Sequence, residues 1–140
     1  MTLLKKEDLP KVDYQGMNIV HERELEVVNR LYAALKEGVG GEELERLLDA
    51  FIEDVINHFS YEEDLMRKSR FFAYECHAGE HKRVLEELNE LKNRWQETGN
   101  RKELLNYLEN TFKPWIVEHV LTMDTVTAQW LSRVMAGVFF

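Results

Sequence analysis

Apolar residues recur at intervals of three and four positions over most of the chain, which is the spacing of amphipathic helices. Glycine and asparagine punctuate this pattern at the loop GVGG of residues 38–41 and again at Gly99 and Asn100, where a helix is expected to stop. The strict alternation that is typical of strands is absent. We therefore predict four helical segments, over residues 17–37, 44–68, 77–98 and 101–135.

Four long helices joined by short loops favour an all-α fold, an up-down-up-down antiparallel four-helix bundle whose apolar stripes face a common axis. A length of 140 residues fits a single domain spanning residues 1–140. Residues 1–16 are predicted to form an extended N-terminal arm, and the end of the fourth segment a short C-terminal helical extension. Pro114 interrupts the fourth segment, and we expect a kink there because proline lacks a backbone N–H.

Composition and charge limit the kinds of molecule that the protein is expected to bind. The hydrophobic fraction of 44% and the charged fraction of 31% are those of a soluble globular protein. A net charge of −8 without a basic stripe would repel a phosphate backbone, so we expect no nucleic acid partner. No apolar run reaches the roughly 18 residues of a membrane span, and the early charges of MTLLKKEDLP argue against a signal peptide. We expect a cytoplasmic monomer, with no role for the lone Cys76.

All histidines of the chain occupy the apolar stripes of their predicted helices, where leucine or valine would be expected, and so does Glu62. Burial of an unpaired carboxylate costs several kcal/mol or more, so these side chains need something to bind. In an antiparallel bundle the starts of the first and third helices meet the ends of the second and fourth, so the polar side chains should converge at one end of the core. The histidines are His21, His58, His77, His81 and His119.

Two pairs of these residues are separated by four positions, and each pair would share one face of a helix. They are His58 with Glu62 and His77 with His81. One such pair alone would be read as ordinary core or surface histidines, but the convergence of all of them favours a metal site. Imidazole with carboxylate suits iron, zinc, copper or nickel, and the lack of clustered cysteines argues against a zinc–thiolate site.

Asp124 follows His119 by five positions, which turns its side chain about 140° beyond the histidine on a regular α-helix. Either the helix loosens there, as in a π-bulge, or Asp124 is not a ligand. Geometry alone leaves both alternatives open.

In chain order, the chain has a lone histidine, the motif HxxxE, the motif HxxxH and the motif HxxxxD. This order resembles the hemerythrin family, in particular the single-domain bacterial hemerythrins, over roughly residues 14–131. The resemblance implies a four-helix bundle around a non-haem pair of iron ions that binds dioxygen reversibly. The metal ligands that it implies are His21, His58, Glu62, His77, His81, His119 and Asp124.

The resemblance also implies how these ligands divide. One iron would be held by the three histidines of the third and fourth helices, and the other by His21 and His58. Glu62 and Asp124 would bridge the two ions together with an oxygen atom, as an Fe–O–Fe unit. One coordination position then stays open, on the two-histidine iron, and dioxygen would bind there.

Trp115 and Ile116 match the aromatic and aliphatic residues that often line the family's oxygen pocket, although ordinary helix packing would explain them as well. Two positions depart from the family pattern. Asn18 stands where the family commonly has aspartate, and Glu24 where it has an apolar residue that faces the pocket. Glu24 could reach the open iron or its hydrogen-bonded shell, which would favour autoxidation or peroxide chemistry. The favoured expectation is that Glu24 meets water while Leu25 faces inward.

The residues are compatible with three classes of function. The resemblance favours oxygen carriage, storage or sensing without turnover, in the service of an oxygen-consuming protein. The alternative is a di-iron enzyme acting on peroxide or nitric oxide, but the paired ExxH motifs of carboxylate-rich di-iron oxidases do not occur. A purely structural helical interaction protein would require every histidine to be free of metal.

Overall fold

Helices account for most of the chain, which confirms the predicted all-helical class. The computed structural model describes residues 2–137 and contains no strand within that range. Met1 and residues 138–140, at the outer ends of the predicted arm and C-terminal extension, lie outside the described residues. In chain order the elements are a 3-10 turn η1 (Lys6–Asp8), α1 (Gln15–Glu37), α2 (Gly41–Lys68), α3 (Tyr74–Thr98), α4 (Arg101–Tyr107), η2 (Leu108–Phe112), α5 (Lys113–His119), η3 (Val120–Asp124) and α6 (Thr125–Gly137).

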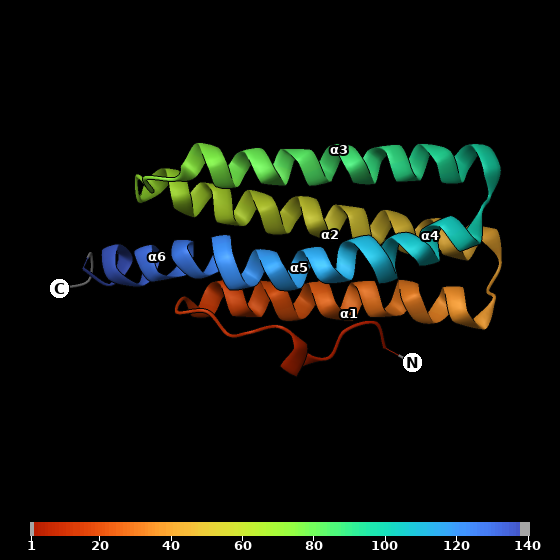
Figure 1. The fold of residues 1–140 in the computed structure, drawn as a ribbon, viewed down its shortest axis with the longest axis horizontal. Coiled ribbons are helices and arrows are strands. Elements are labelled where there is room, and N and C mark those ends of the chain that lie inside the picture. Colours follow the sequence, from red (N-terminus) through yellow and green to blue (C-terminus); the bar gives the residue numbers. More distant parts are fainter. Residues whose placement is uncertain (1, 138–140) are drawn as a thin grey trace.

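The helices lie side by side along one long axis and form a bundle (Figure 1). α1 packs on α2, α2 packs on α3, and α4 contacts both α3 and α1. The chain passes from α1 to α2 at one end of the bundle, from α2 to α3 at the opposite end, and from α3 to α4 at the first end again (Figure 1). The beginning of α1 therefore lies at the same end as the connection between α2 and α3.

Two glycines end helices by adopting the left-handed backbone conformation. Gly38 follows α1 with φ of 73°, and Gly99 follows α3 with φ of 63°. Each donates its backbone N–H to the carbonyl four residues earlier, a conformation that glycine reaches without steric cost. Asn100 directly precedes α4 and caps its start, because its side-chain oxygen accepts a hydrogen bond from the backbone N–H of Glu103 at 3.2 Å. The predicted stop at residues 99 and 100 is confirmed.

The fourth predicted segment is a continuous run of helix that contains two wider turns. The π-helical turns η2 and η3 separate α4, α5 and α6. Pro114 is the second residue of α5, two positions after the end of η2. Proline has no backbone N–H to bond the preceding turn, and its ring crowds a carbonyl of that turn. A widened turn therefore stands beside the residue at which the sequence predicts a kink.

Two asparagines hold the N-terminal arm against α1. The Oδ1 atom of Asn29 accepts hydrogen bonds from the backbone N–H groups of Leu3 and Leu4 at 2.9 and 3.1 Å, and its amide donates to the carbonyl of Leu4 at 2.9 Å. Asn18 pairs with Val12 in the same way, accepting from its N–H and donating to its carbonyl, both at 2.9 Å. An ionised aspartate cannot donate. Asn18 therefore has a structural role that aspartate could not fill.

The helix α1 begins at Gln15, two residues before the predicted helix over 17–37. Gly16 lies in its first turn, where a Cβ atom would collide with the hydroxyl of Tyr61 on α2. Glycine at this position lets α2 approach the start of α1 closely.

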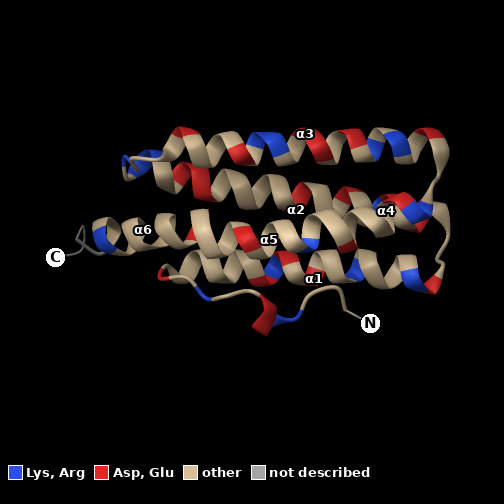
Figure 2. Cartoon of the chain, in the orientation of Figure 1, with Lys and Arg blue, Asp and Glu red and all other residues tan. Residues whose placement is uncertain are grey.

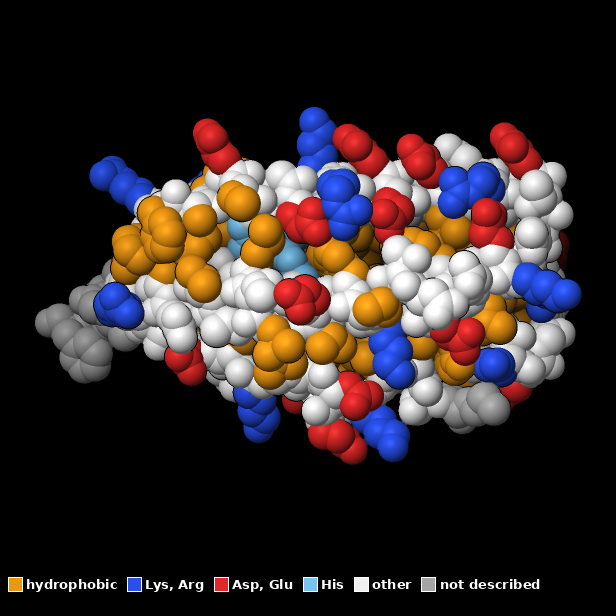
Figure 3. Space-filling model, viewed as in Figure 1, with side chains coloured by type: hydrophobic (Ala, Val, Ile, Leu, Met, Phe, Trp, Pro, Cys, Tyr) orange, Lys and Arg blue, Asp and Glu red, His pale blue; other side chains and the backbone are white. Residues whose placement is uncertain are grey.

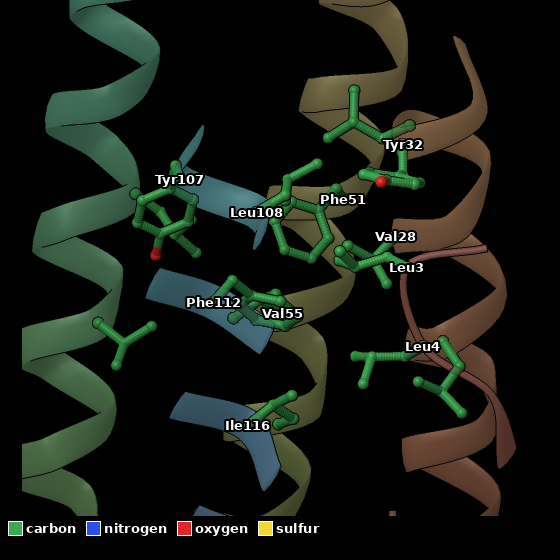
Figure 4. Close-up of a cluster of buried hydrophobic side chains, with 14 of the residues drawn as sticks. Leu3, Leu4, Val28, Tyr32, Phe51, Val55, Tyr107, Leu108, Phe112 and Ile116 are labelled. Carbon is green, nitrogen blue, oxygen red and sulfur yellow. The ribbon is translucent and has the colours of Figure 1, made fainter. Parts of the chain in front are cut away.

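An apolar core fills the part of the bundle on the side of the α1–α2 and α3–α4 connections. Phe51 of α2 and Phe112 of η2 are fully buried and meet edge to face, with ring centroids 5.0 Å apart. Val28, Val55 and Leu108 gather around them (Figure 4). Charged residues occur along all the long helices (Figure 2). Among the described residues, no helix combines the length and apolar character needed to cross a membrane.

Candidate metal centre

Seven polar side chains meet inside the bundle, toward the end where α1 begins and α2 passes into α3. All seven are at most 4% exposed. Their nitrogen and oxygen atoms form two groups, and within each group the atoms lie within 4.8 Å of one another. One group consists of Glu62, His77, His81, His119 and Asp124, and the other of His21, His58, Glu62 and Asp124. The structure thus brings together every residue that the sequence predicts as a ligand.

Glu62, on α2, belongs to both groups and divides its two oxygens between them. Its Oε2 atom lies 2.7 Å from Nε2 of His58 and 3.3 Å from Nε2 of His21. Its Oε1 atom lies 3.3 Å from Nε2 of His81 and 3.5 Å from Nε2 of His77. One carboxylate therefore faces two separate sets of imidazoles.

Asp124, at the end of η3, divides its oxygens in the same way. Its Oδ2 atom lies 3.1 Å from Nε2 of His21, and its Oδ1 atom lies 3.1 Å from Nε2 of His77 and 3.3 Å from Nε2 of His119. The π-helical turn η3 spans the residues between His119 and Asp124. A π-turn takes in more residues than an α-turn, so it returns a side chain five positions on to the same face. Of the two alternatives left open by the sequence, the loosened helix is the one found.

Three of the imidazoles also have a polar partner on the Nδ1 side, away from the cluster. Such a partner fixes the orientation and tautomer of the ring and leaves Nε2 facing inward. The pairs are His58 with Oε1 of Glu24 (2.9 Å), His77 with Oγ1 of Thr127 (2.7 Å) and His81 with Oε2 of Glu63 (2.9 Å).

Sequence reasoning did not identify Glu63 or Thr127. Glu63 directly follows a predicted ligand, and Thr127 lies three positions after Asp124, which places it near the same face of α6. These short separations are the only sequence signal that could have pointed to them, because each contact joins two different helices.

Glu24 is 3% exposed, and its neighbour Leu25 is 6% exposed. The favoured expectation that Glu24 meets water is therefore wrong. Its carboxylate lies behind His58, next to the ring nitrogen that faces away from Glu62.

Aromatic rings cover one histidine of α3 and the histidine of α5. Phe59 stacks on His81 with centroids 3.9 Å apart and an interplanar angle of 3°, and Trp115 stacks on His119 at 4.5 Å and 19°. Ile116 is buried and belongs to the apolar core. On one face of the molecule, histidine atoms are visible between apolar side chains (Figure 3). The role of Trp115 and Ile116 in an oxygen pocket stays a prediction.

The carboxylates favour positive charge on the imidazoles despite their burial. Burial lowers the pKa of His21, but the carboxylates of Asp124 and Glu62 beside its ring outweigh this effect and raise the pKa to about 9. The same balance raises the pKa of His77 to about 9. Burial also opposes ionisation of Glu62, yet the charge of His58 and hydrogen bonds from the histidines hold the pKa of Glu62 well below its usual value. The pKa of Asp124 is likewise lowered by its histidine neighbours, against its burial. The cluster is built to hold positive charge between two anions.

Several atoms that face the centre of the cluster make no hydrogen bond. They are Nε2 of His81, Oε1 of Glu62 and both carboxylate oxygens of Asp124, all buried. Buried polar atoms in native proteins nearly always have a partner, and an ion is one of the few things that can explain an exception. Carboxylate oxygens and imidazole nitrogens are suitable ligands for a divalent transition metal. The residues of the cluster therefore fit a metal site with two adjacent positions.

Comparisons with known proteins cover the same part of the chain. The family model of the Hemerythrin HHE cation binding domain matches residues 13–131, a range that includes all seven cluster residues. A bacteriohemerythrin of Aquifex aeolicus (strain VF5) is 36% identical over 131 residues, which are 93% of this chain and 98% of that protein. A bacteriohemerythrin of Methylococcus capsulatus (strain Bath) is 25% identical over 112 residues, which are 80% of this chain and 83% of that protein.

Proposed function

The chain belongs to the hemerythrin family, and on this premise we propose that it is a non-haem di-iron protein that binds dioxygen reversibly, for carriage, storage or sensing. The observation that carries the proposal is the shared position of Glu62 and Asp124, each of which offers its oxygens to both groups of imidazoles. Two buried anions between two sets of imidazoles, which release their protons when metals bind, suit two cations side by side.

In this proposal the ligands divide as the family pattern implies. When bound, the iron pair would supply an open coordination position on the two-histidine side and the electrons needed to hold dioxygen. The ligands would be carried by a single domain over residues 1–140 with up-down-up-down topology. One iron would be held by His77, His81 and His119, the other by His21 and His58, with Glu62 and Asp124 bridging them.

The residues of the chain bind, orient and shield the metals. Thr127 and Glu63 hold two of the imidazoles at Nδ1, so that their Nε2 atoms need not reorient when a metal enters. Phe59 and Trp115 cover histidine faces, and Ile116 adds an apolar wall. An apolar surround keeps water and protons away from the centre, which favours reversible binding over irreversible oxidation. We therefore propose a binding protein rather than an enzyme.

The test is repeated oxygenation of iron-loaded protein. Protein reconstituted with ferrous iron without oxygen is exposed to dioxygen, then flushed with argon, while iron content and the visible spectrum are followed. We expect about two iron ions per chain, matching the two ligand groups, and a visible absorption that appears with dioxygen and disappears on flushing over several cycles. A single irreversible conversion would contradict the proposal, and steady turnover of peroxide or nitric oxide would indicate an enzyme.

Two variants make the test specific to the cluster. Glu62→Gln removes one charged oxygen donor that both groups share, and it should abolish the reversible absorption. Glu53→Gln changes an exposed carboxylate on the same helix and should behave like the parent. Equal behaviour of the two variants would remove Glu62 from the proposal.

A further inference from the structure

Glu24 is a buried carboxylate that joins two helices through one imidazole. It lies on α1, and its Oε1 atom accepts from Nδ1 of His58 on α2 at 2.9 Å. The Nε2 atom of the same ring lies 2.7 Å from Oε2 of Glu62. The side chain of Glu24 is 4% exposed and that of His58 is fully buried. The imidazole is thus held between two carboxylates that water does not reach.

The other Nδ1 partners differ from Glu24 in charge or in exposure. Glu63, behind His81, has a side chain that is 24% exposed, so solvent screens its charge. Thr127, behind His77, is buried but neutral. Among these three supported imidazoles, only His58 has a fully buried negative charge behind it.

We propose that Glu24 is a positioning residue for the two-histidine half of the centre, where it fixes His58 as the Nδ1–H tautomer and adds a buried negative charge behind this ligand. The proposal rests on the proposed function for the metals involved. With Nδ1 donating to Glu24, Nε2 is the nitrogen that faces the cluster, and its lone pair becomes available when a metal displaces the proton between Nε2 and Glu62. The carboxylate makes the imidazole a stronger donor, which favours a more highly charged metal at that position.

Two substitutions separate the hydrogen bond from the charge. Glu24→Gln keeps an oxygen acceptor of nearly the same size but removes the charge. Glu24→Leu removes both and places an apolar side chain where the family pattern has one. Glu63→Gln and Glu63→Leu are the matched controls, because they make the same changes behind His81 at a more exposed carboxylate.

The first readout is ferrous iron binding without oxygen, measured by competition with a chelator. We expect Glu24→Leu to weaken one of the two sites by about 10- to 100-fold, as loss of such a partner typically does, while the other site keeps the parent affinity. Glu24→Gln should retain two irons but show a higher reduction potential, because a negative charge near the metals has been removed. The Glu63 variants should change both quantities less.

The second readout does not need iron. Nitrogen NMR of histidine side chains in chelator-treated protein reports whether Nδ1 of His58 carries a proton and a hydrogen bond. The signal of His58 should change in both Glu24 variants and stay unchanged in both Glu63 variants. Thermal unfolding of the same chelator-treated samples shows that each variant is folded.

The outcomes separate this inference from the proposed function. A parent chain that binds two irons but not dioxygen overturns the oxygen-binding proposal, and the Glu24 comparison still stands on affinity and NMR. A Glu24→Leu variant with the parent's affinity at both sites and an unchanged His58 signal would overturn the positioning role, whatever the parent does with oxygen.

Discussion

The interior of the bundle has an apolar half around Phe51 and Phe112 and a polar half around Glu62 and Asp124. All four side chains are at most 1% exposed, and all lie on inward faces of their helices. In the apolar half the side chains are satisfied by packing against one another. In the polar half, by contrast, Oε1 of Glu62 and both oxygens of Asp124 lack a hydrogen bond.

This difference separates two meanings of burial. Apolar burial stabilises the fold whenever the alternative is exposure of the same side chains to water. Polar burial with unpaired atoms costs free energy until a ligand arrives, so its contribution depends on what is bound and on pH. The same helices therefore contain an apolar half that stabilises the fold and a polar half whose side chains the fold holds in position.

The largest expected effect tests the apolar half. Phe51→Ala should lower the free energy of unfolding by about 3–5 kcal/mol, because it removes a buried ring and leaves a cavity beside Phe112. The loss should be similar in iron-loaded and chelator-treated protein, measured by chemical denaturation. Ile56→Ala changes a 44% exposed residue on the same helix and should stay within about 0.5 kcal/mol of the parent. A loss confined to the iron-loaded form would contradict the division into two halves.

The next effect tests the polar half through pH. In chelator-treated protein the pKa values of His21 and His77 are about 9, above the unfolded value of about 6.5. Groups with a raised folded pKa stabilise the protein fully below the unfolded pKa, and that stability is lost as pH rises through the folded pKa. Stability should therefore fall between pH 6.5 and about 9, on the order of 3 kcal/mol for one such imidazole.

Iron loading should reverse this trend, because metals bind neutral imidazoles and release protons, so iron affinity should rise over the same pH interval. Denaturation curves at several pH values, with and without iron, measure both trends. A chelator-treated protein whose stability is independent of pH from 6.5 to 9 would contradict the electrostatic account of the polar half.

The smallest effect concerns polar contacts that are already satisfied within the protein. Asn29→Ala removes the hydrogen bonds that hold the arm at Leu3 and Leu4, and it should cost about 1–2 kcal/mol, equally with and without iron. Asn106→Ala, at an exposed position, should be close to neutral. Thermal denaturation is sufficient for this measurement. A cost that appears only in iron-loaded protein would mean that the arm belongs to the metal site.

Much of the fold followed from local rules. Helix type and number came from the apolar period, and the stop at Gly99 came from its freedom to adopt positive φ. The convergence of the histidines was also predictable, because it depends only on where each residue stands along its helix. The order of the histidine motifs along the chain indicated the hemerythrin family.

What the sequence could not provide depends on contacts between helices or on small departures from regular helix geometry. The placement of Asp124 required the π-turn η3, which a five-residue spacing permits but does not demand. The position of Glu24 depended on the rotation of α1 relative to α2, which no spacing along either helix determines. Apolar period alone places a residue only to within about one face of a helix.

Anomalous diffraction at the iron absorption edge, on crystals of protein loaded with ferrous iron without oxygen, tests the central claim most directly. The account predicts two peaks about 3.5–4 Å apart, both between Glu62 and Asp124, one facing His77, His81 and His119 and the other facing His21 and His58. A single peak, or iron found outside these seven side chains, would contradict it.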